Sequence, residues 1–319
     1  MFRRIDINAD TRLAGYHFLL RLAAVFALTA GAHAQTPSDY APVTLNVACG
    51  EVFRAPCARV LPAIVARIAQ SGLVPRPVES GGARDTIDAV CRGQTAAAIV
   101  PRDAAVQFTR APACLGRYDV VGRPLYPLYA FLVMKADIDL AKRGRPATIA
   151  AGLPGSGGQI TLGLLSQDNP EWQRMTMVTN DDLDAALQRI ADGSIDGYFT
   201  VDSLDSDLIN RVRFRTDSAG KPLYSFIDVR PGTAFLARGD GAGHCLYRLT
   251  ALDFGGASPV TTISVDAVMI LGRAFRDTHA RSGPRASDAL PLAIDQAQGA
   301  ILTATKSPQG WRPAATSCQ

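Results

Sequence analysis

The sequence has few of the residues from which metal and redox sites are built. It contains four histidines, of which only His244 and His279 follow residue 34. Of its six cysteines, no two stand in a Cys-x-x-Cys pair. This scarcity argues against a zinc or thiol-redox centre, and the sequence predicts neither a metal nor a cofactor.

Motifs of common enzyme classes are also missing. There is no Gly-x-Ser-x-Gly nucleophile elbow, and no Gly-x-Gly-x-x-Gly or Gly-Lys-Ser/Thr that would bind a nucleotide. The acidic groups have simpler interpretations. Asp181 and Asp182 precede a helix, while Asp202, Asp205 and Asp207 are interpreted as solvated loop charges. An enzyme is therefore the less favoured class.

Long runs of one kind of residue are absent as well. The lysines and arginines are dispersed, without the basic run that marks a nucleic-acid groove. No apolar segment reaches the roughly 18 uninterrupted residues of a transmembrane helix. The net charge of +4 becomes +2 without residues 1–34, which hold four arginines and two aspartates. Nucleic acid is not a predicted partner.

The first 34 residues have the parts of a secretory signal peptide. Four arginines lie before the apolar run Leu22–Ala30, and Ala32-His33-Ala34 offers a small-residue cleavage site. The sequence therefore predicts cleavage after Ala34 and a periplasmic mature protein.

All six cysteines follow this predicted signal peptide. An even number of cysteines in an oxidising compartment favours disulfides, although the sequence leaves their connectivity open. Cys245–Cys318 and Cys91–Cys114 are the predicted pairs, the first because both residues lie in the C-terminal part of the chain.

Short apolar segments typical of strands alternate with segments that carry apolar residues at helical spacing. The predicted strands begin near Val43, Pro77, Ala96, Thr148, Asp196 and Asp266, and the predicted helices near Cys57, Ala83, Gln159, Ala186 and Ala286. Gly93 and Gly193 each fit the left-handed position that ends a helix. The alternation predicts an α/β fold with mostly parallel strands covered by helices on both faces.

The stretch from Thr148 to Leu165 combines a buried strand, a glycine turn and the start of a helix. Gly155, Gly157 and Gly158 carry no Cβ atoms around the first helical N–H groups, which lack intrahelical partners. The helix dipole adds partial positive charge there. The stretch predicts a site for a carboxylate, sulfonate or phosphate, unless the glycines serve only a tight turn.

Two extended apolar segments are candidates for chain crossings between two lobes. One is residues 118–135, which two prolines interrupt, and the other is expected around residues 224–235. The chain length of about 285 residues after the signal peptide is enough for two ordinary cores.

Five segments resemble, in the same order, those of type 2 periplasmic solute-binding proteins. They are residues 78–83, 97–103, 153–158, 187–197 and 262–271. The chain is most similar to the TAXI family of TRAP-transporter solute receptors. The resemblance implies two α/β lobes joined by two crossovers, with the ligand in the cleft between them. Lobe 1 would be residues 35–125 plus 233–319, and lobe 2 residues 126–232.

The resemblance also implies a ligand site made of loops from both lobes. The predicted ligand-binding residues are Gly50, Glu51, Phe53, Gly81, Gly82, Arg84, Arg102, Tyr129, Gly155, Ser156, Gly157 and Gly158. Arg84 either grips a carboxylate or is a solvated charge at a helix start, and Arg102 has the same two interpretations. Tyr126 and Tyr129 either pack on the ligand or fill the core between the lobes. The loop at 48–57 departs from the family, in which it is glycine-rich.

The function that this resemblance implies is an exported receptor. It would capture a small anionic organic solute as a monomer and deliver it to the permease subunits of a TRAP-type membrane transporter. A periplasmic sensing domain for a signalling partner is the alternative, and an exported enzyme on the same fold is less favoured.

Overall fold

A computed structural model of the chain describes residues 43–50, 54–68, 73–138, 145–179, 182–254, 258–279 and 286–308. All of them belong to one unit, Pro42–Gln319. The predicted signal peptide lies outside the described residues. Within the described ranges, none of the helices combines the length and the apolar character that a membrane span requires.

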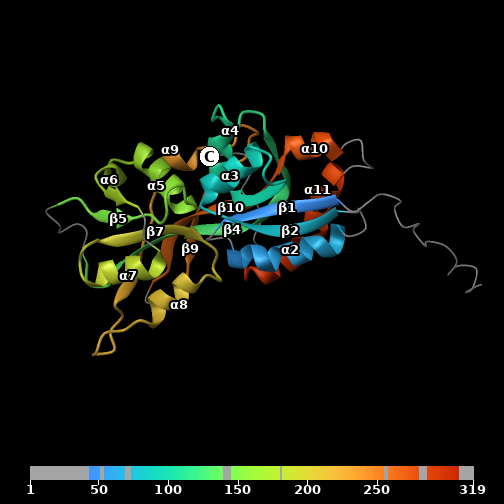
Figure 1. Cartoon of the computed structure of the whole chain (residues 1–319). Coiled ribbons are helices and arrows are strands. Elements are labelled where there is room, and N and C mark those ends of the chain that lie inside the picture. Colours follow the sequence, from blue (N-terminus) through green and yellow to red (C-terminus); the bar gives the residue numbers. More distant parts are fainter. Residues whose placement is uncertain are drawn as a thin grey trace, which may run out of the picture. The chain divides into compact units, whose positions relative to one another are not determined.

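A ten-stranded sheet runs through this unit in the order β2-β1-β3-β10-β4-β7-β5-β6, with β8 beside β4 and β9 beside β10 (Figure 1). The strands are β1 (Val43–Gly50), β2 (Leu73–Ser80), β3 (Ala97–Pro101), β4 (Tyr118–Lys135), β5 (Thr148–Ala150), β6 (Thr176–Val178), β7 (Gly197–Asp202), β8 (Tyr224–Ile227), β9 (Tyr247–Leu252) and β10 (Val260–Gly272). The helices are α2 (Arg54–Ile68), α3 (Ala83–Cys91), α4 (Arg102–Thr109), α5 (Gly157–Asp168), α6 (Pro170–Gln173), α7 (Leu183–Ala191), α8 (Asp207–Phe214), α9 (Thr233–Leu236), α10 (Arg273–His279) and α11 (Ala286–Ala304).

The first group of parallel strands is β2, β1 and β3. Helix α2 buries Val60 and Ile64 in the same apolar cluster as Leu45 of β1. Helices α3 and α4 join a different cluster, which contains Ala48 and Val100. Since successive residues of a strand point to opposite faces, the two clusters cover both faces of this group.

The second group of parallel strands is β6, β5 and β7. Leu187 of α7 and Leu208 of α8 are buried in one cluster with strands β4 and β7. The predicted helix ends are confirmed, because Gly93 and Gly193 follow α3 and α7 with φ values of +71° and +79°. Each group therefore repeats the same helix, glycine and strand unit.

Two long strands join the groups. Strand β4 pairs with β10 along Tyr118–Tyr129 and with β7 along Tyr129–Met134, as expected for a crossing at 118–135. A return crossing was expected around 224–235. In the structure, residues 224–227 form β8, which pairs with the far end of β4 and so stays with the second group. Strand β10 carries the chain back instead, pairing with β9 at one end and with β3 at the other. The fold is thus the predicted mixed α/β arrangement.

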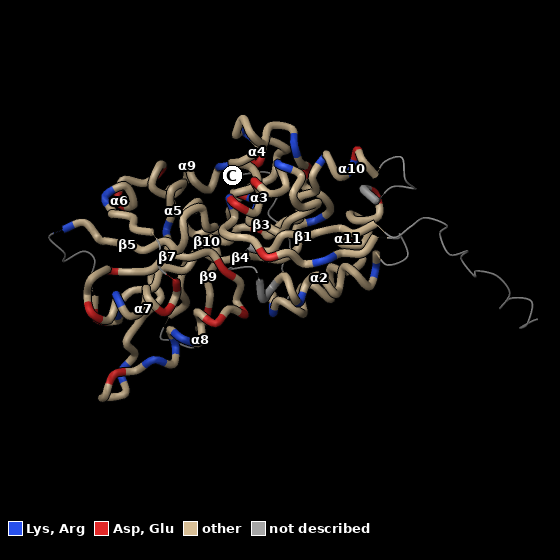
Figure 2. Tube along the Cα trace, viewed as in Figure 1, with Lys and Arg blue, Asp and Glu red and all other residues tan. Residues whose placement is uncertain are grey.

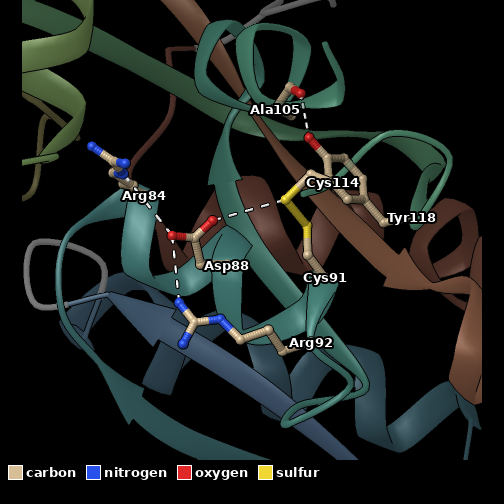
Figure 3. The surroundings of a disulfide bond; sticks show 7 residues. All are labelled: Arg84, Asp88, Cys91, Arg92, Ala105, Cys114 and Tyr118. Atoms are coloured by element: carbon tan, nitrogen blue, oxygen red, sulfur yellow. Dashed lines mark hydrogen bonds and ion pairs between the residues drawn. A yellow bond between two sulfur atoms is a disulfide. The ribbon is translucent and has the colours of Figure 1, made fainter. Parts of the chain in front are cut away.

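The predicted Cys91–Cys114 disulfide is present and ties the end of α3 to the turn after α4, with Cα atoms 5.2 Å apart (Figure 3). Asp88 lies beside this bridge and pairs with Arg84 and Arg92. A second disulfide, Cys49–Cys57, was not predicted from the sequence and joins the end of β1 to α2. Cys245 also takes part in a disulfide, but Cys318 lies outside the described residues, so their pairing stays a prediction.

Replacing both Cys91 and Cys114 with serine is expected to lower the free energy of unfolding by about 2–4 kcal/mol. The bridge joins positions 23 residues apart and so restricts the unfolded chain. Urea unfolding of the oxidised protein and of the double variant measures the difference. A non-reducing peptide map in which either cysteine is alkylated as a free thiol would contradict the assignment.

Candidate functional site

A cavity of about 180 Å³ opens at the carboxyl ends of strands from both groups. Gly82 reaches it from the loop after β2, and the remaining lining comes from the loop after β5, from β7, and from the starts of α7 and α8. The lining residues are Gly82, Gly152, Leu153, Ser156, Asp182, Leu183, Tyr198, Thr200, Asp202 and Leu208. This is the edge at which open α/β sheets bind ligands.

The start of α3 touches the turn before α5. The backbone N–H of Arg84 donates to the carbonyl oxygen of Gly155 at 3.0 Å. A Cβ atom at Gly82 would lie 2.9 Å from the carbonyl group of Gly155 and from the nitrogen of Ser156, which is closer than such contacts allow. Glycine at position 82 therefore permits the two loops to meet beside the cavity.

Side chains near the glycine turn cap part of the start of α5. Ser156 begins α5 and accepts from the N–H of Gln159 at 3.2 Å, while its hydroxyl donates to the carbonyl of Ala151 at 2.9 Å. The amide oxygen of Gln159 accepts in turn from the N–H of Gly155. Side chains of the helix start therefore satisfy the N–H groups of Gly155 and Gln159, while those of Gly157 and Gly158 have no such side-chain acceptor among the described residues.

Gly157 and Gly158 serve close packing. A Cβ at Gly158 would lie 3.0 Å from the Cα of Thr200, and one at Gly157 would lie 3.1 Å from Pro101. The two glycines let α5 lie against β7 and the end of β3. Gly155 adopts a φ of +74°, which suits glycine in a tight turn.

Asp202, at the end of β7, lines the cavity and is not the solvated loop charge that was expected. It is half-buried, and Oδ1 accepts from the N–H of Ser203 at 2.7 Å. Burial, together with the carboxylates of Asp205 and Asp207, raises the pKa of Asp202 to about 7. Its position directly after a strand was the signal in the sequence, because strand ends carry ligand-binding residues in such sheets.

Asp205 is also not the solvated charge that was expected. Its side chain is only 3% exposed, pairs with Arg59 of α2 and accepts from the hydroxyl of Ser203. Asp182 agrees with its predicted place at a helix start, since its side chain accepts from the N–H of Ala185 at the beginning of α7. Figure 2 shows acidic positions around α7 and α8.

The two arginines predicted to grip an anion lie elsewhere. The side chain of Arg84 is 63% exposed, lies 3.9 Å from Asp88 and sits over the ring of Phe108, in a separate groove along α5. Arg102 is buried and paired with Asp240, which also lies 3.1 Å from a ring nitrogen of His244. Neither arginine contributes to the cavity lining described above.

The tyrosines of β4 differ from each other. Tyr129 is buried in an apolar cluster with Phe131, and burial raises the pKa of its hydroxyl to about 12. Tyr126 is fully buried, and its hydroxyl has no hydrogen-bond partner among the residues that the structure describes. Both side chains lie in the apolar core, Tyr126 in the cluster that contains Leu125 and Leu128.

The remaining predicted residues lie near the loop after β1. Gly50 pairs with Ser80 at the ends of β1 and β2, next to Gly81. Glu51 and Phe53 lie outside the described residues. In the part of the chain that the structure describes, no three histidine, cysteine or acidic residues gather as a metal site would need.

No protein-family model matches the chain, and no curated protein is detectably similar to it in sequence. Solved structures are similar in fold. The ligand-binding core of GluR0 in complex with L-glutamate has a TM-score of 0.51 at 11% identity, covering 84% of this chain and 98% of that one. A protein of Listeria monocytogenes described as an L-cystine ABC transporter has a TM-score of 0.47 at 10% identity, covering 86% and 99%.

A third similar structure is the periplasmic VFT2 domain of BvgS from Bordetella pertussis, with a TM-score of 0.43 at 15% identity, covering 79% of this chain and 92% of that domain. At such identities the likeness concerns the fold. The chain has the mixed α/β fold of two-lobed periplasmic binding proteins, with a large central sheet flanked by helices.

Proposed function

We propose that the chain is an extracytoplasmic receptor that binds a small organic solute without transforming it. The observation that carries this proposal is the cavity to which Gly82 contributes from the first strand group and Ser156 and Asp202 contribute from the second. A solute that touches both groups favours the arrangement in which they meet, because its contacts differ between the open and closed forms. Disulfides such as Cys49–Cys57 and Cys91–Cys114 are typical of proteins outside the cytoplasm.

The solute of this proposal is a small zwitterion of the amino-acid type. A cavity of about 180 Å³ is smaller than the sites that hold drug-sized molecules, which supports a compact ligand. The described lining contains the carboxylates of Asp182 and Asp202 and no lysine or arginine. The anionic solute expected from the sequence would therefore also need an ammonium group to pair with Asp202.

Delivery of the solute to a TRAP-type transporter is the finer part of the proposal, and the sequence resemblance to TAXI receptors supports it. The neighbouring genes test it directly. A gene for a large multispan permease next to this one agrees with transport, whereas a sensor kinase gene in its place would favour a sensing domain.

A thermal-shift screen tests the receptor proposal. The three sets of compounds are the standard L-amino acids, the same acids without the amino group, and simple amines without an acid group. A ligand present at a hundred times its Kd should add about 2.7 kcal/mol of stability. We expect a shift with at least one amino acid and none with its amine or acid counterpart. The proposal is wrong if no compound shifts the transition, or if NMR finds that a bound compound has been converted.

A further inference from the structure

A second cavity, of about 270 Å³, lies at the edge of the first strand group opposite to the ligand-binding edge. Asn46 in the first half of β1 and Thr95 just before β3 line it, together with Gly272 at the end of the antiparallel β10. Strand β3 is five residues long, or roughly 15 Å, and separates this edge from the one at Pro101. The second cavity is therefore distinct from the proposed solute site.

The floor of the second cavity is a firmly bonded part of the sheet. The N–H of Ala96 donates to the carbonyl oxygen of Asn46 at 3.0 Å, and the N–H of Gly272 donates to that of Ala96 at 2.8 Å. The N–H of Thr95 donates to the carbonyl oxygen of Ala89. Because these backbone groups are paired within the protein, recognition of a ligand here falls to the side chains.

The side chains that line the second cavity are polar, but they are not those of the strongly charged residue types. The described lining contains no lysine, arginine, aspartate or glutamate. An ion placed here would lose hydration without gaining an opposite charge, so the lining favours a neutral ligand with many hydrogen-bonding groups. The lining offers hydroxyls, amides and one imidazole, from Thr44, Asn46, Gln94, Thr95, Thr278 and His279.

Thr95 gives a specific reason to expect a ligand at this place. The residue is 8% exposed, and its hydroxyl has no hydrogen-bond partner among the residues that the structure describes. Buried hydroxyls are nearly always paired, because an unpaired one loses the hydrogen bonds that it makes with water in the unfolded chain. A polar group of a ligand in the second cavity would supply a partner.

His279 offers an oriented acceptor. Its Nδ1 lies 2.9 Å from the carbonyl oxygen of Phe275, and since a carbonyl oxygen only accepts, Nδ1 carries a proton. In the neutral ring, Nε2 is then an acceptor. The ring stacks on that of Phe275 with centroids 4.3 Å apart, which holds its orientation. Phe275 also lines the second cavity and adds an apolar surface to it.

We propose that the second cavity binds a neutral polyhydroxylated molecule of the size of one sugar ring, and that Thr95, Asn46 and His279 contact its hydroxyls. Amide and hydroxyl side chains donate and accept hydrogen bonds, as sugar hydroxyls do, and Phe275 faces the C–H groups of the ring. A volume of about 270 Å³ lies just below that of sites for drug-sized molecules, which suits a single ring. This site is additional to the proposed receptor function.

Saturation-transfer NMR, which detects weak binding, tests the proposal with glucose as the probe. Glucuronate has the same ring with a carboxylate, and cyclohexanol has a six-membered ring with a single hydroxyl. We expect a transfer signal from glucose and much weaker signals from the other two at equal concentration. The absence of a glucose signal, or an equal signal from either counterpart, would overturn the proposal.

Thr95→Val replaces the unpaired hydroxyl with a methyl group of similar size, and two effects of opposite kind are expected. The melting temperature should rise, because the variant no longer buries an unpaired hydroxyl. The apparent affinity for glucose should fall by about twofold to tenfold, because the sugar loses one hydrogen bond. If the melting temperature rises and glucose binds as before, Thr95 is only a core residue and the assignment is wrong.

Thr303→Val is the matched control, because Thr303 is an exposed threonine of α11 outside the second cavity. It should leave the glucose signal unchanged. Asp202→Asn, which alters the solute cavity, should also leave it unchanged, and loss of the signal in that variant would overturn the second site by placing glucose in the first. The two cavities share no described lining residue, so failure of the amino-acid screen would not affect this result.

Discussion

Gly82→Ala is expected to weaken solute binding by about tenfold to a hundredfold while changing the free energy of unfolding only slightly. The new Cβ would lie 2.9 Å from the backbone of Gly155 and Ser156, and a backbone cannot rotate away as a flexible side chain can. Overpacking of this kind costs about 1–3 kcal/mol, which corresponds to the stated range of affinities. The φ of Gly82 is −63°, so alanine fits the local backbone.

The strain falls on the contact between the loops and not on either strand group, so the variant can relieve it by separating them. Isothermal titration with a solute found by the screen measures the affinity, and urea unfolding measures stability. Gly163→Ala is the control, because no atom lies within 4 Å of a Cβ built there in the middle of α5. It should leave binding unchanged and stabilise the helix by about 0.5–1 kcal/mol. Normal affinity in Gly82→Ala would mean that binding does not need the two loops to meet.

The fold could be predicted from the sequence because its signals are local. Apolar periodicity and the turn glycines Gly93 and Gly193 belong to single β-strand and helix units, and the structure has these units where the pattern placed them. The return crossing was misplaced because it depends on strand pairing. The segment at 224–227 is apolar and short, and only its register with Leu132–Lys135 shows that it stays in the second group.

The site was less predictable because it also depends on contacts between residues that are far apart in the sequence. The glycine turn could be recognised because a strand, glycines and a helix follow each other directly. Asp205 carries no such signal, because a carboxylate in a sequence rich in aspartate and serine is usually solvated. Its burial results from the approach of Arg59, which lies far away in the sequence. The pairing of Arg59 with Asp205 therefore depends on tertiary packing, which a local sequence pattern does not reveal.

Asp202→Asn is expected to lower the affinity for an ammonium-bearing solute by about tenfold or more and to remove the pH dependence of binding. Burial first, then Asp205 and Asp207, raises the pKa of Asp202 from 3.8, the ordinary value of an aspartate, to about 7 in the folded protein. The ammonium pairs with the ionised form, so affinity should fall by about tenfold per pH unit as the pH drops below 7. This decline should be absent from Asp202→Asn.

The stability of the solute-free protein should change with pH in the opposite direction. Because the folded pKa is above the unfolded one, the folded state binds more protons between about pH 4 and pH 7, and the stability from Asp202 is full below this window and lost as the pH rises through it. Urea unfolding and titration calorimetry over the same pH values measure both effects. Asp137→Asn, an exposed aspartate outside the cavity, should leave both curves as in the wild-type protein. If affinity stays constant from pH 5 to 8 in the wild-type protein, the solute does not pair with Asp202, because a group that titrates near pH 7 cannot hold a cation equally well on both sides of that value.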